Sequence, residues 1–316
     1  MSQWRVVAVG WALLLLAACR AGAGQVSPPN PTPSRPTPAL TRPTDTPTPM
    51  SDKFDGAQAF DHLTAQMALG PRYPGSPGHL AARDYIERSL TGLGWTVERQ
   101  AFEYRGFEAV NLIGRNPQAP AGPILLIGAH YDTRARADQS PDQADKPVPG
   151  AVDGASGVAV LLELARVLDV SAAKGQVWLL FFDAEDNGDD GLPGWDWIVG
   201  STHLAETLTV TPAAMVLVDM VGDADQQLYW EANSDVALRE TLWRIAADLG
   251  FGEQFIPQLR HSMIDDHIPF VQRGIPAVDV IDFDYPYWHT VADSADKASP
   301  DSLYRVGRVL EVWLER

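Results

Sequence analysis

The chain has 316 residues, of which 45% are hydrophobic, and it carries a formal net charge of −17. It is long and apolar enough to bury a sizeable core, whereas its acidity argues against a nucleic-acid partner, because a phosphate backbone requires a surface rich in Lys and Arg. The sequence holds one cysteine, which excludes an intramolecular disulfide and a cysteine-based zinc finger.

The first residues predict export from the cytoplasm. Arg5 precedes an apolar run over residues 6–18, which is too short to span a bilayer comfortably. The run ends in LAAC (residues 16–19), which resembles the cleavage box of a bacterial lipoprotein, whose cysteine carries the lipid. We therefore expect a lipoprotein signal peptide over residues 1–19 and a membrane anchor at Cys19, at the cell surface or in the periplasm. An ordinary signal peptide with an incidental cysteine is the alternative.

The next segment, residues 20–50, predicts a linker. From Gln25 to Pro49 it consists mainly of Pro, Thr and Ser, with almost no large apolar residue. Such a composition cannot bury enough surface to fold, and its prolines favour an extended spacer. We expect a stalk over residues 20–50 and a folded catalytic domain over residues 51–316.

The folded segment alternates helical and strand patterns. Apolar spacing predicts two helices over residues 54–69 and 78–93, and then strands over 96–104, 109–113 and 123–129. A helix over 157–168, a strand over 177–182, a helix over 198–208 and a strand over 214–218 follow. A helix over 236–249, a strand over 275–281 and a helix over 303–314 close the chain. This alternation predicts an α/β fold, a three-layer α/β/α sandwich with a mixed, mostly parallel central sheet.

Side chains that can bind a metal stand beside these predicted strands and helices. They are His130, Asp153, Glu185, Asp186, Asp219 and His289. All but Asp153 follow a predicted strand, and Asp153 precedes the helix over 157–168. Each alone would be read as a helix cap, a turn former or a structural histidine. Because ligands bind outside the carboxyl ends of strands in open α/β sheets, we expect these residues to converge. Imidazole and carboxylate ligands without thiolates suit a catalytic zinc with an open position.

Six short motifs carry a resemblance to a known family. They are GAHYDT (128–133), PGAVDGASGVA (149–159), FFDAEDNG (181–188), LVDMVGD (217–223), DDHIPF (265–270) and WHT (288–290). In this order they resemble the co-catalytic zinc aminopeptidase family and, within it, the zinc-dependent glutaminyl cyclases. The resemblance runs from about residue 54 to the C-terminus, nearly the whole predicted domain.

The resemblance implies a role for each metal-binding candidate. In the family, Glu185 falls on the general base and Asp153 on a ligand that bridges two metals. The full two-metal ligand set corresponds to His130, Asp153, Asp186, Asp219 and His289. The position of Asp186 is often Glu, which is a mild departure. Cyclases hold one zinc through the equivalents of Asp153, Asp186 and His289, with His130 and Asp219 as hydrogen-bonding neighbours. Peptidases fill both positions, so the number of zinc ions stays open.

Three features favour the cyclase branch. Position 265 is Asp here, as in cyclases, whereas peptidases usually have Ser or Thr at this point. The resemblance implies that Asp265 and Asp219 take part in catalysis. Trp288 precedes His289 as in cyclases, and Trp195 or Trp197 falls near a pocket tryptophan of that branch. We place Trp288 and Trp195 in the substrate pocket, although the sequence does not distinguish Trp195 from Trp197. As alternatives, Asp265 could cap a short helix over 266–272, and Trp288 could belong to the core.

These observations predict a zinc-dependent acyltransferase that closes the N-terminal glutamine of peptides or proteins to pyroglutamate and releases ammonia. Its partners would be peptide or protein N-termini, with no nucleic acid and with membrane contact only through the lipid anchor. One alternative is a metallo-aminopeptidase with one or two zinc ions. Another is a surface binding module with a degenerate site, against which the retained Glu185 argues, since a structural zinc needs no free carboxylate beside it.

Overall fold

The computed structural model describes residues 53–189 and 191–316. The predicted signal peptide with Cys19 and the predicted linker therefore lie outside the described residues. Among the residues that are described, no helix is both long enough and apolar enough to cross a membrane.

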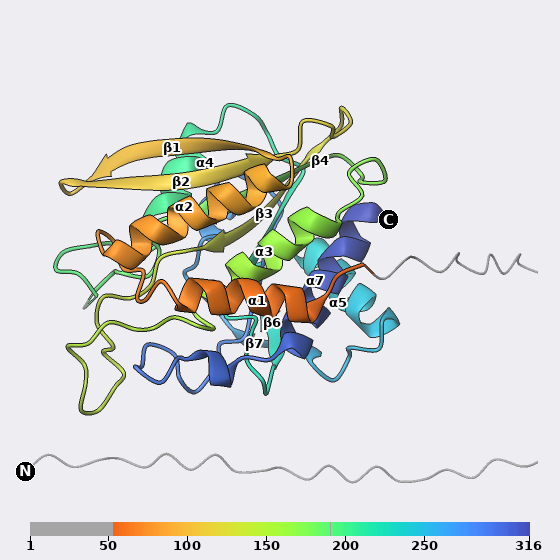
Figure 1. The fold of residues 1–316 in the computed structure, drawn as a ribbon. Helices are drawn as coiled ribbons and strands as arrows, with labels where there is room; N and C mark the ends of the chain where they lie inside the picture. Colours follow the sequence, from red (N-terminus) through yellow and green to blue (C-terminus); the bar gives the residue numbers. More distant parts are fainter. Residues whose placement is uncertain (1–52, 190) are drawn as a thin grey trace, which may run out of the picture. The chain divides into compact units, whose positions relative to one another are not determined.

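The central sheet has six strands in the order β1-β2-β4-β3-β5-β8 (Figure 1). These strands are β1 (Thr96–Tyr104), β2 (Phe107–Arg115), β3 (Ile124–His130), β4 (Gln176–Phe182), β5 (Ala214–Asp219) and β8 (Ala277–Ile281). The hairpin β1–β2 joins β4 in antiparallel fashion, whereas β4, β3, β5 and β8 run parallel. The carboxyl ends of the four parallel strands therefore lie at one edge of the sheet.

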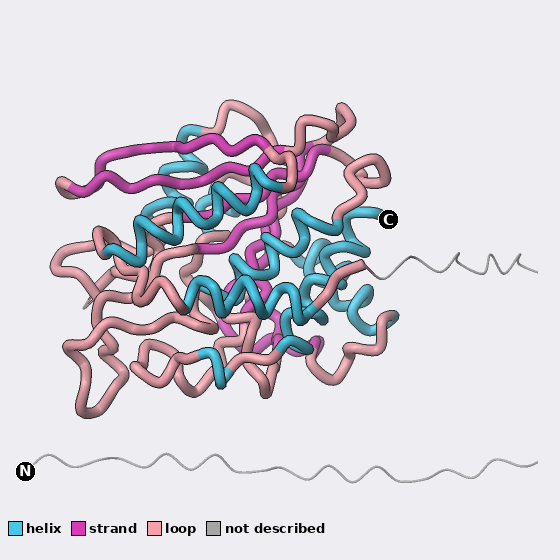
Figure 2. The backbone as a smooth tube through the Cα atoms, viewed as in Figure 1, coloured by secondary structure: helices cyan, strands magenta, loops and turns pink. Residues whose placement is uncertain are grey.

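Helices cover the sheet, as predicted. They are α1 (Gly56–Met67), α2 (Pro77–Gly92), α3 (Ala155–Val167), α4 (Val199–Thr207), α5 (Val236–Asp248), α6 (Ile268–Gln272) and α7 (Pro300–Glu315), with a 3-10 turn at Ala295–Lys297. In Figures 1 and 2, α1, α2 and α3 lie in front of the strands. Ser76 caps α2 by accepting a hydrogen bond from the backbone N–H of His79 (3.1 Å). The predicted α/β/α sandwich with a mixed, mostly parallel sheet is confirmed.

The core explains why the parallel strands read as continuous apolar runs. One face of the sheet packs against α4 and α6 in a single buried cluster, which includes Leu126, Leu180, Phe182, Met215 and Leu217 from the strands and Leu204 and Phe270 from the helices. All six residues of β5 are buried. A strand covered on both faces has no solvent side that would require alternating polar residues.

A second, two-stranded sheet was not predicted from the sequence. It pairs β6 (Leu228–Glu231) with β7 (Phe255–His261) in parallel. β6 is only four residues long, and most of β7 is exposed or half-buried. A short strand and a strand with little buried surface both lack the apolar run on which strand prediction depends.

Candidate active site

The ends of three neighbouring parallel strands bring the predicted ligands together. His130 is the last residue of β3, and Asp219 is the last residue of β5, its parallel neighbour. β4 pairs with β3 on the other side, with His130 opposite Phe182, and the loop after Phe182 carries Glu185 and Asp186. The sheet therefore positions these side chains through backbone pairing rather than through contacts between the side chains themselves.

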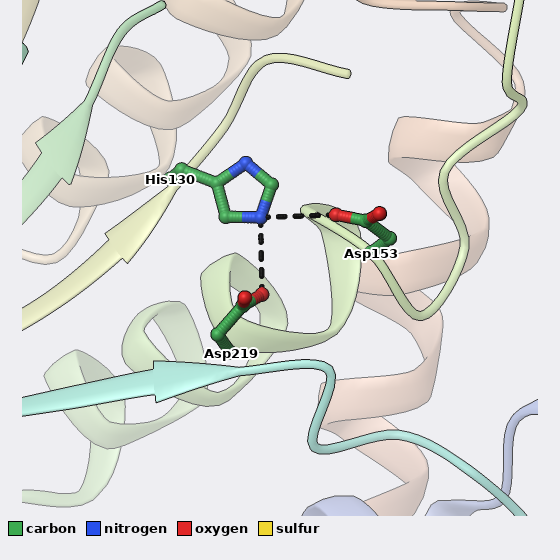
Figure 3. A group of neighbouring side chains, drawn as sticks. All are labelled: His130, Asp153 and Asp219. Carbon is green, nitrogen blue, oxygen red and sulfur yellow. Dashed lines mark hydrogen bonds and ion pairs between the residues drawn. The ribbon is translucent and has the colours of Figure 1, made fainter. Parts of the chain in front are cut away.

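A first group of ligand candidates consists of His130, Asp153 and Asp219. The Nε2 atom of His130 lies 3.0 Å from a carboxylate oxygen of Asp219 and 3.2 Å from one of Asp153. Figure 3 shows this nitrogen directed at both carboxylates. All three residues are buried, and their donor atoms lie within 4.8 Å of one another. Such a group can hold one metal ion.

A second group shares Asp153 with the first. It consists of Asp153, Asp186 and His289, which are all buried and whose donor atoms also lie within 4.8 Å of one another. The Nε2 atom of His289 lies 2.9 Å from Asp186 and 3.9 Å from the second carboxylate oxygen of Asp153. The two oxygens of Asp153 thus face different groups, which is the arrangement of a bridging carboxylate.

The donor set fits zinc. One carboxylate oxygen of Asp153 and one of Asp186 are buried without a hydrogen-bond partner, and a bound cation would satisfy both, since an unpaired buried polar oxygen is costly. Burial, and to a smaller extent the nearby Asp153, raise the pKa of Asp186 to about 6. Two imidazoles with carboxylates and no thiolate are the ligands of a catalytic zinc.

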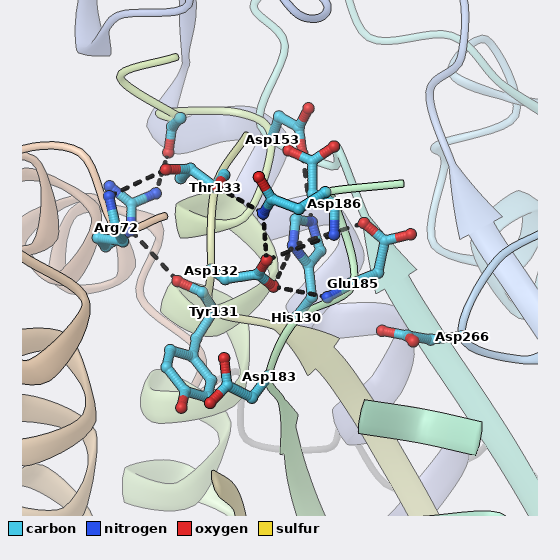
Figure 4. A network of polar contacts seen from close by, with 12 residues as sticks. Arg72, His130, Tyr131, Asp132, Thr133, Asp153, Asp183, Glu185, Asp186 and Asp266 are labelled. Carbon is cyan, nitrogen blue, oxygen red and sulfur yellow. Dashed lines mark hydrogen bonds and ion pairs between the residues drawn. The ribbon is translucent and has the colours of Figure 1, made fainter. Parts of the chain in front are cut away.

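Glu185 lies beside both groups and is held by its backbone. Its N–H donates to Asp132 (3.0 Å), which also accepts from the N–H of Asp186 (3.3 Å) and the side-chain amide of Asn187 (3.0 Å). Figure 4 shows Asp132 at the centre of these contacts. Burial, with Asp186 and Asp265 nearby, raises the pKa of Glu185 well above its usual range. Asp132 therefore fixes the loop that carries both acids.

No role was predicted for Asp132, although the sequence contains a signal for it. Residues i and i+2 near the end of a strand point to the same side, and Asp132 lies two residues after His130. The residue is fully buried. A buried carboxylate between two candidate ligand segments needs donors, and the backbone of residues 185 and 186 supplies them.

A cavity of about 380 Å³ opens onto the site. Its polar floor is formed by Asp153, Glu185, Asp186, Asp219, Asp265 and His289, and its apolar wall by Trp197, Met220, Met263, Ile264, Ile281, Phe283 and Trp288. Every predicted catalytic residue and the second ligand group therefore face one cavity, whereas His130 lies behind its floor. No Lys or Arg side chain lines this cavity.

The cavity distinguishes the two candidate tryptophans. Trp197 lines it, and Trp195 does not, so the placement of Trp195 in the pocket is wrong. The Trp195 ring packs instead against Tyr104 and Phe107 of the β1–β2 hairpin, with ring centroids 5.3 and 5.6 Å apart. One residue separates the two tryptophans in a loop without regular structure, and periodicity cannot decide which one turns inward.

Asp265 does not cap the short helix α6. The N-cap position belongs to His267, without a side-chain hydrogen bond. One Asp265 carboxylate oxygen accepts the N–H of Asp266 (2.6 Å), and the side chain, which is only 3% exposed, lines the cavity. Burial, together with Asp219 and Asp266, raises the pKa of Asp265 well above its usual range. Trp288 both lines the cavity and packs on the buried residues Met220, Ile281 and Tyr285.

Three residues of the site adopt left-handed backbone conformations. Ala184 (φ 57°) precedes Glu185, Met220 (φ 46°) follows Asp219, and His289 (φ 55°) is itself a ligand candidate. This conformation costs a residue other than glycine about 1–2 kcal/mol, so the surrounding fold imposes it. Left-handed residues at these points turn the chain sharply, so that the side chains of Glu185, Asp219 and His289 face the cavity.

The fold and the two ligand groups define a metal-dependent enzyme of the α/β exopeptidase class. Comparison with known proteins identifies the family: the chain belongs to Peptidase family M28, whose profile matches residues 111–314. The chain is 31% identical over 290 residues to the glutaminyl-peptide cyclotransferase of Bothrops jararaca, covering 77% of this chain and 76% of that protein.

Solved structures of two bacterial proteins are similar over nearly the whole described chain. The glutaminyl cyclase of Bacteroides thetaiotaomicron, bound to N-acetylhistamine, has a TM-score of 0.77 at 29% identity and covers 84% of this chain and 98% of its own. A Zn-dependent exopeptidase from Parabacteroides distasonis has a TM-score of 0.77 at 31% identity, with 84% and 99% covered. The resemblance predicted from the motifs is confirmed.

Proposed function

We propose that this protein is a zinc-dependent glutaminyl-peptide cyclotransferase, which converts the N-terminal glutamine of peptides or proteins to pyroglutamate and releases ammonia. The observation that carries the proposal is Asp265, whose buried side chain faces the cavity beside Glu185 rather than capping α6. The activity named for the relatives at 30–31% identity supports it.

In this reaction the α-amine of the substrate attacks its own side-chain amide carbon. The amine must lose a proton as the new C–N bond forms, and the amide nitrogen must gain one before it leaves as ammonia. Glu185 is the group placed for both transfers, because it lines the cavity and its pKa is raised by burial and by Asp186 and Asp265. A positioned base of this kind typically contributes about 10²–10⁴-fold.

The cavity wall holds the substrate for attack. Trp197 and Trp288 confine the glutamine side chain, and Asp265 faces it from the floor with a raised pKa that favours the protonated, hydrogen-bond-donating form. Because the attack is intramolecular, holding the amine close to the amide carbon in one geometry replaces much of the help that an external nucleophile would need. The acidic floor also attracts the cationic amine before it is deprotonated.

Zinc would be held by Asp153, Asp186 and His289, and when bound it supplies a Lewis acid for the amide carbonyl oxygen. We propose one ion per chain, because this is the ligand group that faces the cavity. His130 then serves as a hydrogen-bonding neighbour of Asp153, and Asp219 as a neighbour of His130, at the distances they already show.

A second candidate function is a two-zinc aminopeptidase. It is favoured by the complete first ligand group and by the two-faced placement of Asp153, and by the similarity to a Zn-dependent exopeptidase. In that reaction Glu185 would take a proton from the attacking water, so the same residue would serve a hydrolytic step.

One experiment separates the two functions. The purified, zinc-loaded protein is incubated with a Gln-led and a Leu-led peptide that are otherwise identical, and both are followed by mass spectrometry. A mass loss equal to one ammonia from the Gln peptide alone, absent in Glu185→Gln, supports the cyclase. Release of the first residue from the Leu peptide would instead establish the peptidase.

We also propose export and lipid anchoring at Cys19, which rest on the sequence of residues 1–19. Labelling with a fatty-acid probe in a bacterial host tests the anchor. Label that disappears in Cys19→Ser supports it, whereas unlabelled protein with an N-terminus cut elsewhere would favour an ordinary signal peptide.

A further inference from the structure

The loop that carries the shared ligand Asp153 is held from two sides by buried side chains. Arg72, from the segment between α1 and α2, donates from Nη1 to the carbonyl of Pro149 (3.0 Å) and from Nη2 to the carbonyl of Gly150. Asp293 accepts the N–H groups of Val152 (2.9 Å) and Asp153 (3.2 Å). One side chain therefore binds the carbonyls of this loop, and the other binds its amides.

Arg72 also binds the segment that follows the other central ligand, His130. Its Nε donates to the carbonyl of Tyr131 (3.3 Å), and its backbone N–H donates to the hydroxyl of Thr133 (2.9 Å). Figure 4 shows the guanidinium beside this segment, on the side away from Glu185. Arg72 is fully buried, and a planar guanidinium with several fixed donors is suited to joining carbonyls from two loops.

The glycines of the PGAVDG segment fit this arrangement. Gly150 and Gly154 both have positive φ angles, 74° and 97°. A Cβ atom at Gly150 would lie 2.8 Å from Nη2 of Arg72, and one at Gly154 would lie 2.7 Å from the carbonyl oxygen of Asp132. Both contacts are closer than real Cβ atoms approach, so the loop can pack against Arg72 and Thr133 only with glycine at 150, and against the backbone of Asp132 only with glycine at 154.

We infer that Arg72 is a positioning residue, which with Asp293 sets the placement of Asp153 relative to His130 and thereby the zinc affinity of the site. Arg72 does not line the substrate cavity, so it acts through the ligands and not on the substrate. It also lies outside residues 111–314, which match the family profile. The segment before that match therefore completes the metal site.

Zinc affinity provides the test, measured by competition with a chelator on the purified full-length protein. Arg72→Met keeps the aliphatic stem and removes the donors, and we expect it to weaken zinc binding by about 10–100-fold, the range for groups that orient metal ligands. Arg72→Lys can reach one carbonyl but cannot join two loops, so we expect it to lose less zinc affinity than Arg72→Met. Turnover of a Gln-led peptide should fall in kcat with little change in KM.

Arg308→Met is the matched control for the loss of a buried arginine, since Arg308 is 5% exposed and pairs with Glu311 within α7 (2.7 Å). The inference is overturned if Arg72→Met lowers the melting temperature as Arg308→Met does and both keep wild-type zinc affinity. If Arg72→Met does not fold, wild-type zinc affinity in Arg72→Lys overturns it equally.

The kinetic readout rests on the proposed function, whereas the zinc affinity does not. Loss of zinc affinity in Arg72→Met together with an inactive wild type on Gln-led peptides would refute the cyclase and leave the positioning role of Arg72 standing. An active wild type with unchanged zinc affinity in the Arg72 variants would refute the positioning role of Arg72 and leave the cyclase proposal standing.

Discussion

The imidazole of His289 lies parallel to the indole of Trp197, with ring centroids 5.9 Å apart and an angle of 6° between the planes. On Trp197, the guanidinium carbon of Arg134 lies 4.7 Å from the ring centroid, and the indole N–H donates to Asp189 (3.2 Å). A ring held by these contacts can wall a pocket at little further cost in conformational entropy.

Replacing this wall should weaken substrate binding. We expect Trp197→Ala to raise KM for Gln-led peptides about tenfold, because an aromatic side chain contributes of order 1–2 kcal/mol when it covers a bound group. Trp195→Ala is the control, since Trp195 packs on Tyr104 and Phe107 outside the cavity. Steady-state kinetics of both variants make the comparison. Equal effects of the two substitutions would contradict the assignment of Trp197.

Metal content should respond unequally to the two ligand groups. We expect His289→Ala to abolish activity and the tightly bound zinc, because it removes a donor from the group that faces the cavity. His130→Gln should keep one zinc per chain and part of the activity. Atomic absorption on the purified variants measures the metal, and zinc titration of the chelated wild type should restore activity at one equivalent. Recovery only at two equivalents would favour the two-zinc peptidase.

The rim of the cavity should select the residue after the N-terminal glutamine. Ile264 is 72% exposed and lines the cavity, next to Met263 and Phe283. We expect Ile264→Ser to raise KM about fivefold for Gln-Leu peptides but not for Gln-Gly peptides, corresponding to roughly 1 kcal/mol of lost apolar contact. Leu259→Ser provides the control, since Leu259 is 62% exposed in β7 and does not line the cavity. A similar rise in KM for both peptides would rule out a contact between Ile264 and the second residue of the substrate.

Stability should depend on pH through Asp282, at the end of β8. Burial and the nearby Asp223 raise the pKa of Asp282 to about 7. An acid whose pKa is raised in the folded state favours folding when protonated, so its contribution declines as the pH rises from about 4 to 7. Asp282→Asn should therefore change stability little near pH 4 and gain on the order of 1 kcal/mol at pH 8, or about 2–4 °C in Tm.

Thermal unfolding at the two pH values measures this difference. Asp142→Asn is the control, because Asp142 is exposed and its substitution removes the same charge from the surface. Equal gains at pH 4 and pH 8 for Asp282→Asn would contradict a raised pKa at this position.

Most of the sheet and of the ligand set could be predicted because both depend on local patterns. The strand over Thr96–Tyr104 was predicted with its observed bounds, whereas β3 and β5 extend one residue further than predicted because they end on the polar residues His130 and Asp219. The apolar run in the sequence ends before such residues, although the strand's backbone pairing continues through them.

Other parts of the site depend on contacts that leave no local pattern. Arg72 binds carbonyls 59 and 77 residues away in the chain, and Asp293 binds amides 141 and 140 residues away. Their partners are backbone groups, which every residue type possesses. The sequence therefore cannot reveal such pairs, and only the folded chain shows which loops they join.

The two-faced carboxylate of Asp153 has a thermodynamic consequence. Because one side chain belongs to both ligand groups, an ion at either position changes the charge and orientation that the other position offers. Two ions would therefore bind with a coupling free energy, and the effect of each on the other would be equal and reciprocal. A substitution that empties one position would also shift the affinity of its neighbour, so the two positions would titrate as one linked system.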